Sequence, residues 1–157
     1  MCKIINFRNL SISIEFNQRV CQIIFEQNMT MFEKTISSTK NTPEIRLNPD
    51  GVIKITGRSM NGKVTEFTEQ IETWIDEYII NPPELTLIDF NLEYFDEINL
   101  KIYYSLLKKI ESIKSKNKKF IINWYYEEGD EDILEKGEKI STVLDIPFNF
   151  IMIGDPA

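Results

Sequence analysis

Apolar and polar positions change their period between Leu85 and Leu107, from the two-residue period of a strand to the period of a helix. One face of the first part is apolar or threonine: Thr86, Ile88, Phe90 and Leu92. The other face is polar: Asp89, Asn91 and Glu93. This alternation predicts a strand in a sheet with one buried face. After Phe95, apolar residues recur at steps of three and four and predict a helical stripe: Ile98, Ile102, Leu106, Ile110 and Ile113.

The point where the two periods meet has the chemistry of a helix start. Asp96 is a good N-cap, because its side chain can accept hydrogen bonds from the first free amides of the helix. Glu97 then falls in the first turn, where the positive end of the helix dipole favours an anion. A strand that runs directly into a helix presents its junction residues to solvent, so we expect the functional surface there.

Two strands and a helix are predicted before this junction. Glu44–Leu47 and Val52–Thr56 alternate around Asn48-Pro49-Asp50-Gly51, which predicts a hairpin. A loop follows from Gly57 to Gly62. The next helix ends near Pro82, because proline cannot continue the hydrogen-bond ladder. Its apolar stripe consists of Phe67, Ile71, Trp74, Ile75 and Tyr78.

A strand, a helix and a last strand are predicted after the junction helix. Phe120–Tyr126 is rich in β-branched and aromatic residues, as buried strands are. The acidic loop Glu127–Asp132 opens a helix, and Pro147–Ile153 is the last strand. The stripe of that helix consists of Ile133, Leu134, Ile140 and Val143. The order β-β-α-β-α-β-α-β predicts a single α/β domain, whose mixed sheet combines an N-terminal hairpin with three helices.

Residues 1–38 carry weaker signals. Three apolar residues alternate: Ile12, Ile14 and Phe16. With the apolar Val20–Phe25 they are consistent with one or two short strands, while Met29 and Met31 are further candidate start residues. We expect an N-terminal extension over 1–38, flexible or arising from an upstream start assignment, with an ordered part of the fold as the alternative. One domain then covers 39–157.

The composition narrows the functional classes. The chain has 157 residues, 42% hydrophobic and 27% charged, enough for one globular domain with a full core. Its net charge of −7 disfavours nucleic acid and anionic membranes as partners. It has no histidine, which excludes histidine-based acid–base catalysis, Ser-His and Cys-His nucleophile pairs and most zinc sites. These bounds favour a binding protein without a cofactor over an enzyme.

Other polar motifs have structural explanations. The acidic loop Glu127–Asp132 lacks the spacing of a calcium loop, and acids are favoured before a helix. The lysines near the end of the junction helix suit its C-terminus, although they could also contact an acidic partner: Lys108, Lys109, Lys114, Lys116, Lys118 and Lys119. Cys2 and Cys21 lack metal-ligand spacing. Without a signal peptide or an apolar run near the length of a membrane span, we expect a cytoplasmic protein with reduced thiols.

Five short stretches carry a resemblance to a known family. They are Thr42-Pro43-Glu44-Ile45, Gly57-Arg58-Ser59, Leu92-Glu93-Tyr94-Phe95, Trp124-Tyr125-Tyr126-Glu127-Glu128 and Ile146-Pro147-Phe148. In order and spacing the chain resembles the SiaC family of bacterial regulatory phosphoproteins. The resemblance implies a fold similar to the STAS domain of anti-sigma-factor antagonists, and a non-enzymatic role. It also implies a SiaB-like kinase and a PP2C-type phosphatase as partners. In the characterised branch, the unphosphorylated form activates a diguanylate cyclase, which makes the biofilm signal cyclic di-GMP.

The chain departs from the family at the phosphoacceptor. The family carries a threonine there, in a motif of the type Tyr-Phe-Asn-Thr-Ser-Ser at the strand-to-helix junction. The same place reads Tyr94-Phe95-Asp96-Glu97-Ile98-Asn99, so Glu97 stands where the threonine is expected. A carboxylate cannot accept the regulatory phosphate as an ester. The preceding loop differs as well, because Ser59-Met60-Asn61-Gly62 replaces a Ser-Tyr-Pro-Glu-like run.

We interpret the chain as a member locked in one state, with Glu97 as a phosphate mimic in the simplest case. Glu97 carries one negative charge, against about −1.5 to −2 for a phosphothreonine. It could equally act only as a residue that is not threonine, or as a cap-region acid. The expected partner-contact surface around Glu97 consists of Arg58, Ser59, Met60, Asn61, Tyr94, Phe95, Asp96, Ile98, Asn99 and Lys101.

Two alternatives remain open from the sequence. The switch could persist at another hydroxyl, for which an exposed Ser59 is the nearest candidate. The chain could also be an enzyme with a carboxylate site, built from Asp89, Glu93, Asp96 and Glu97. No nucleophile, metal spacing or histidine supports that second alternative.

Overall fold

A computed structural model describes residues 31–60 and 64–154 of the chain. The alternation at Ile12–Phe16, the apolar Val20–Phe25 and the candidate contact residue Asn61 lie outside the described residues. No helix within the described ranges is long and apolar enough to cross a membrane.

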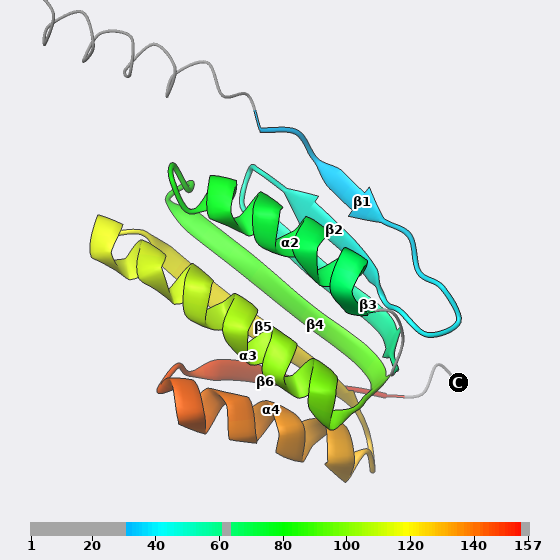
Figure 1. Cartoon of the computed structure of the whole chain (residues 1–157). Helices are drawn as coiled ribbons and strands as arrows, with labels where there is room; N and C mark the ends of the chain where they lie inside the picture. The colour runs from blue at the N-terminus through cyan, green and yellow to red at the C-terminus, as the bar shows by residue number, and fades with distance from the viewer. Residues whose placement is uncertain (1–30, 61–63, 155–157) are drawn as a thin grey trace, which may run out of the picture. The chain divides into compact units, whose positions relative to one another are not determined.

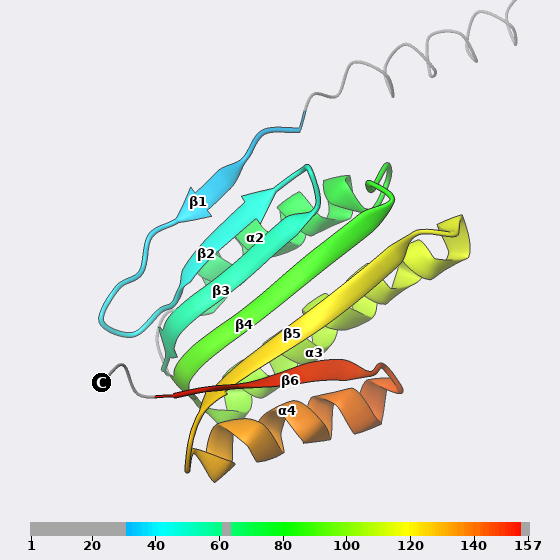
Figure 2. The same cartoon turned by 180° about the vertical axis from the view of Figure 1, so that it is seen from behind.

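The domain is one six-stranded sheet with its helices on one face (Figure 1). The strands are β1 Lys34–Ile36, β2 Glu44–Asn48, β3 Val52–Ser59, β4 Leu85–Phe95, β5 Lys119–Glu127 and β6 Phe148–Ile153. The helices are α2 Val64–Tyr78, α3 Glu97–Glu111 and α4 Glu131–Leu144, with a short 3₁₀ helix η1 at Ser112–Lys116. Seen from behind, the other face of the sheet carries none of the helices of the described residues (Figure 2). The predicted α/β class and the three helices are confirmed.

The strands follow one another in chain order across the sheet. β1, β2 and β3 pair antiparallel, and β3 to β6 pair parallel. Each parallel step therefore needs a crossover, which α2, α3 and α4 supply on the same side of the sheet. Because β4 and β5 run parallel, their carboxyl ends meet at one end of the sheet, and the β4–α3 junction lies there.

β1 is a sixth strand that the sequence pattern did not predict. It pairs with β2 in the register Lys34↔Leu47 to Ile36↔Ile45, within the range 1–38, for which an ordered part of the fold is the alternative to an extension. Main-chain hydrogen bonds to β2 hold it, and three residues are too few to show a hydrophobic period. The ordered domain therefore begins earlier than residue 39.

The core lies between the sheet and the helices, with Trp124 at its centre. The predicted inward face of β4 is buried: Thr86, Ile88, Phe90 and Leu92. The Trp124 ring lies 5.1 Å from Phe90, 5.8 Å from Phe95 and 5.9 Å from Phe148, measured between centroids. Its indole Nε1 donates a hydrogen bond of 3.0 Å to the carbonyl oxygen of Ile133. The indole therefore joins the sheet to the start of α4.

Two predicted stripe residues face solvent instead of the core. Ile98 is 48% exposed and Val143 is 62% exposed. The buried row of α3 runs through Asn99, Leu100, Tyr103, Leu106, Leu107 and Ile110. The buried row of α4 runs through Ile133, Gly137, Ile140 and Leu144. In both helices the residues that face the core form a row next to the exposed one. The prediction that Ile98 and Val143 face the core was therefore wrong.

We predict that Gly137→Ala destabilises the domain. A Cβ at Gly137 would lie 2.6 Å from the Cε2 and Nε1 atoms of the Trp124 indole, which is fixed on all sides. Overpacking costs about 1–3 kcal/mol, and three atoms of a rigid ring within 2.8 Å of the added Cβ place this site at the upper end. The helix propensity of alanine offsets about 1 kcal/mol, so the net loss is about 2 kcal/mol. Urea unfolding measures it. Glu138→Ala, exposed on the same helix, is the control and should change stability by less than about 0.5 kcal/mol. Equal effects would contradict this packing.

Candidate functional site

Asp96 caps helix α3, as its position in the sequence predicted. Its carboxylate oxygen Oδ1 accepts hydrogen bonds from the backbone amides of Ile98, at 3.1 Å, and Asn99, at 3.0 Å. The backbone amide of Asp96 donates to the carbonyl oxygen of Ser59 at 3.3 Å. The end of β4 and the start of α3 are therefore fixed to each other and to the end of β3.

Glu97 is the first residue of α3 and its side chain is exposed. None of the ion pairs formed among residues 31–60 and 64–154 involves Glu97 or Lys101. Since Asp96 already satisfies the first amides of the helix, the carboxylate of Glu97 is not needed as a cap.

Exposed apolar side chains lie at the ends of the elements that meet at this junction. Met60, Tyr94 and Ile98 are among the large hydrophobic residues that the domain leaves exposed. Ile98 follows Glu97 in the first turn of α3. Tyr94 lies three residues before Glu97, at the end of β4. Met60 follows Ser59, whose carbonyl contacts the helix start. We call these four residues, Met60, Tyr94, Glu97 and Ile98, the junction surface.

Three of the expected contact residues lie inside the domain and support the junction surface. They are Ser59, Phe95 and Asn99. Ser59 is only 2% exposed, and its hydroxyl oxygen accepts a hydrogen bond of 2.7 Å from the hydroxyl of Tyr103. Its carbonyl oxygen accepts another, of 2.8 Å, from Nδ2 of Asn99. The expectation that Ser59 offers an exposed hydroxyl for phosphorylation was therefore wrong.

Burial also affects the hydroxyl of Tyr103, which donates to Ser59. It raises the pKa of the Tyr103 hydroxyl well above its usual value, with the hydrogen bond to Ser59 acting in the opposite direction. The hydroxyl therefore stays protonated and remains a donor to Ser59 throughout the physiological pH range.

Lys136 of α4 is a further junction residue that sequence reasoning missed. Its ammonium group donates to the carbonyl oxygen of Phe95 at 2.7 Å and to Oδ2 of Asp132 at 2.6 Å. The same nitrogen lies 4.9 Å from the centroid of the Phe95 ring and 5.4 Å from that of Tyr94. Helix α4 thereby holds the last residues of β4. The only local signal was the four-residue spacing of Asp132 and Lys136.

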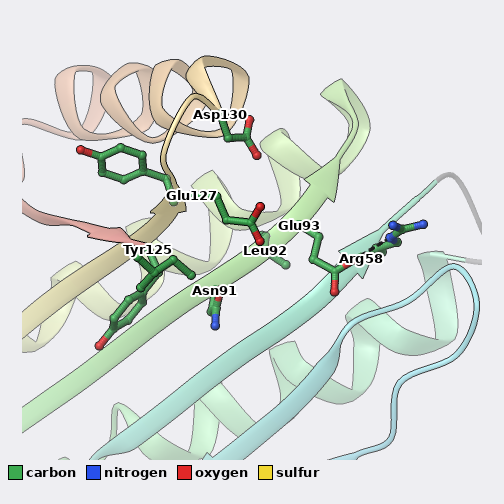
Figure 3. Close-up of a pocket in the computed structure, with 9 residues that line it drawn as sticks. Arg58, Asn91, Leu92, Glu93, Tyr125, Glu127 and Asp130 are labelled. Carbon is green, nitrogen blue, oxygen red and sulfur yellow. Dashed lines mark hydrogen bonds and ion pairs between the residues drawn. The ribbon is translucent and has the colours of Figure 1, made fainter. Parts of the chain in front are cut away.

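Arg58 lies on the helix-free side of the sheet, beside a cavity of about 250 Å³ (Figure 3). Its Nε atom pairs with Oε2 of Glu93 at 2.7 Å. Figure 3 shows the carboxylates of Glu93, Glu127 and Asp130 around this hollow. Asp130 also caps α4, because its Oδ1 accepts from the Ile133 amide at 3.1 Å. The acidic loop therefore has a structural role as the cap of α4. Among the described residues, no group of three potential ligands could hold a metal ion.

The structure does not assemble the four carboxylates of the enzyme alternative. Asp89 accepts a hydrogen bond of 2.8 Å from Nδ2 of Asn123 in the middle of the helix-free face. Glu93 pairs with Arg58, Asp96 caps α3, and Glu97 is exposed. Each carboxylate has its own surroundings, so they do not converge on one reacting centre.

The fold and the junction define a single-domain α/β protein with exposed side chains at a strand-to-helix junction, where hydrogen bonds of Ser59 and Lys136 hold the backbone. The sequence model of the SiaC family, described as "SiaC family regulatory phosphoprotein", matches residues 36–153. The chain therefore belongs to the SiaC family. No curated protein matches it.

Three solved structures share the fold. A chain in the crystal structure of the diguanylate cyclase SiaD in complex with its activator SiaC from Pseudomonas aeruginosa matches with a TM-score of 0.68 and 20% identity. That match covers 78% of this chain and 99% of the other. SiaC of Pseudomonas aeruginosa matches with a TM-score of 0.65 and 19% identity, and the match covers 80% of this chain and 100% of the other. The apo form of SiaC from Pseudomonas aeruginosa matches with a TM-score of 0.66 and 20% identity, and the match covers 78% of this chain and 98% of the other.

We predict that Ser59 and Tyr103 are energetically coupled. Ser59→Ala leaves the buried Tyr103 hydroxyl without its partner and should lower the free energy of unfolding by about 1–3 kcal/mol. Adding Tyr103→Phe to that variant should cost little more, because both polar groups are then gone. Urea unfolding of the two single variants and the double variant measures the coupling. Additive losses would show that the two hydroxyls do not interact.

Proposed function

We propose that this chain is a non-enzymatic regulatory protein, which binds a protein partner through the junction surface and is not switched by phosphorylation at position 97. The observation that carries the proposal is the exposed Glu97, which forms no ion pair among the described residues. The family resemblance places the phosphoacceptor at this position. Asp96 supplies the cap, which leaves the carboxylate free for recognition.

The make-up of the junction surface supports recognition of a protein. Aromatic residues and methionine are enriched at the centres of protein interfaces, and Tyr94 and Met60 supply both. The rigid supports of this surface keep the entropy cost of binding low, because the backbone is already held by Ser59 and Lys136. A partner with a cation opposite Glu97 and an apolar rim would match it.

The proposed partner is a diguanylate cyclase, since SiaC in the structurally similar complex is the activator of the diguanylate cyclase SiaD. A SiaB-like kinase and a PP2C-type phosphatase are further proposed partners, which the family resemblance supports. In this proposal Glu97 holds the chain in one state towards all three, the state of an unphosphorylated member, because one charge and two acceptor oxygens imitate a phosphate only in part. The proposed compartment is the cytoplasm, where Cys2 and Cys21 would stay reduced.

We predict that Glu97→Ala weakens binding to the diguanylate cyclase of the same organism by about 10- to 100-fold. A hydrogen bond to a charged group contributes about 1.5–3 kcal/mol, and each 1.4 kcal/mol is tenfold in affinity. Isothermal titration calorimetry measures the change. Glu131→Ala is the matched control, because Glu131 is the exposed first residue of α4 behind its own cap, Asp130.

The control variant should bind within about twofold of wild type. Glu97→Gln separates charge from shape and should lose most of what Glu97→Ala loses. Identical affinities for wild type and Glu97→Ala would leave Glu97 as a first-turn acid and place the interface elsewhere.

We predict that Glu97→Thr restores a phosphoacceptor. If the surface around position 97 still fits a SiaB-like kinase, the purified kinase with ATP should add one phosphate to the variant and none to position 97 of wild type. Intact-mass and phosphopeptide mass spectrometry measure this. Phosphorylation of wild type elsewhere in the junction, at the same rate, would contradict a locked state.

A further inference from the structure

Within the part of the chain that the structure describes, strand β6 has no backbone partner along its outer edge. The order of the sheet places it last, and it pairs with β5 in the parallel register Ile122↔Phe148 to Glu127↔Ile153. Figures 1 and 2 show it at the border of the sheet. In such a pair, alternate residues direct their N–H and C=O groups away from the neighbouring strand. None of the other backbone hydrogen bonds in the described ranges involves residues of β6.

β6 also lacks the features with which sheet edges prevent pairing. Natural edge strands are protected by charged side chains, proline, bulges or short length. The sequence of β6 is Phe148-Asn149-Phe150-Ile151-Met152-Ile153, with five apolar residues, no charge and no proline. Met152 is 57% exposed. The opposite edge strand, β1, has only three residues and begins with Lys34.

We propose that β6 pairs antiparallel with β6 of a second copy, which joins the two sheets into one across a two-fold axis. Charge favours this site over other surfaces. At a net charge of −7, two copies repel each other overall, whereas β6 brings no like charges face to face. The free N–H and C=O groups of each strand supply the partners that the other lacks.

A register centred on Ile151 fits the side chains. Directly opposite residues of an antiparallel pair lie on the same face, so Met152 of each copy meets Phe150 of the other on the helix-bearing face. Phe150 lies on that face because it follows the buried Phe148 by two residues. Methionine and aromatic rings make favourable contacts. On the helix-free face, Ile151 meets its own symmetry mate and Asn149 meets Ile153.

Such a dimer would present two junction surfaces. β4 runs parallel to β6, by way of β5, and the two-fold axis reverses the strand direction. The two copies of Glu97 would therefore lie at opposite ends of the joined sheet. If the proposed function holds, the dimer would be bivalent and could engage two partner molecules at once.

Sedimentation velocity of the full chain tests the pairing. The concentration should run from about 1 to 500 µM, because a single strand pair buries less area than the interface of a stable dimer and therefore associates weakly. The weight-average mass should rise from 18.5 kDa towards twice that value. Met152→Lys should weaken dimerisation at least about tenfold, because an edge lysine disfavours pairing. Val143→Lys is the matched control, since Val143 is 62% exposed on α4 and outside β6, and it should dimerise like wild type.

Hydrogen exchange assigns the interface. Amides of Phe148–Ile153 should exchange more slowly at high concentration in wild type and should not change in Met152→Lys. Glu97→Ala should dimerise as wild type does, so failure of the junction proposal would not be mistaken for failure of the pairing. A monomer at every concentration, an equal loss in the two lysine variants, or a dimer without protection of β6 would each overturn the proposal.

Discussion

The backbone and side chain of Ser59 hold the end of β3 against the start of α3, and the junction surface depends on this contact. The carbonyl oxygen accepts from the amide of Asp96 and from the side chain of Asn99, while the hydroxyl accepts from Tyr103. All three donors lie at the cap or in the first two turns of α3. A buried polar group that loses its partner costs about 1–3 kcal/mol, so the helix start cannot shift freely. Glu97 is therefore presented from a fixed position.

This fixed position limits what Glu97 can do. An acid in the first turn of a helix contributes only about 0.3–1 kcal/mol through the dipole, and Asp96 already supplies the cap. A structural role alone therefore explains little of its presence. As a phosphate mimic the carboxylate offers two acceptor oxygens and one charge, against three oxygens and about −1.5 to −2. A partner that grips phosphate with an arginine fork would hold it less tightly, so the imitation is partial.

Hydrophobic periodicity was enough to predict β4 and α3, because long elements repeat their pattern many times. It could not predict β1, since the three residues Lys34–Ile36 give no period and main-chain bonds hold the strand. A stripe also does not say which of two neighbouring rows faces the core, and α3 buries Asn99 rather than Ile98. The contacts of Ser59 and Lys136 span 44 and 41 residues, so no local pattern encodes them.

The helix-free face of the sheet explains why partners would meet this domain at its ends and edge. Side chains in one row across four strands satisfy one another: Lys54, Asp89, Asn123 and Asn149. Nδ2 of Asn149 donates to Oδ1 of Asn123 at 3.1 Å, and Nδ2 of Asn123 donates to Asp89 at 2.8 Å. Covering this row with a partner would remove it from water without offering new hydrogen bonds, which costs free energy. Among the described residues, Glu97 forms no ion pair and the outer edge of β6 has no backbone partner, so binding at either place adds contacts instead of replacing them.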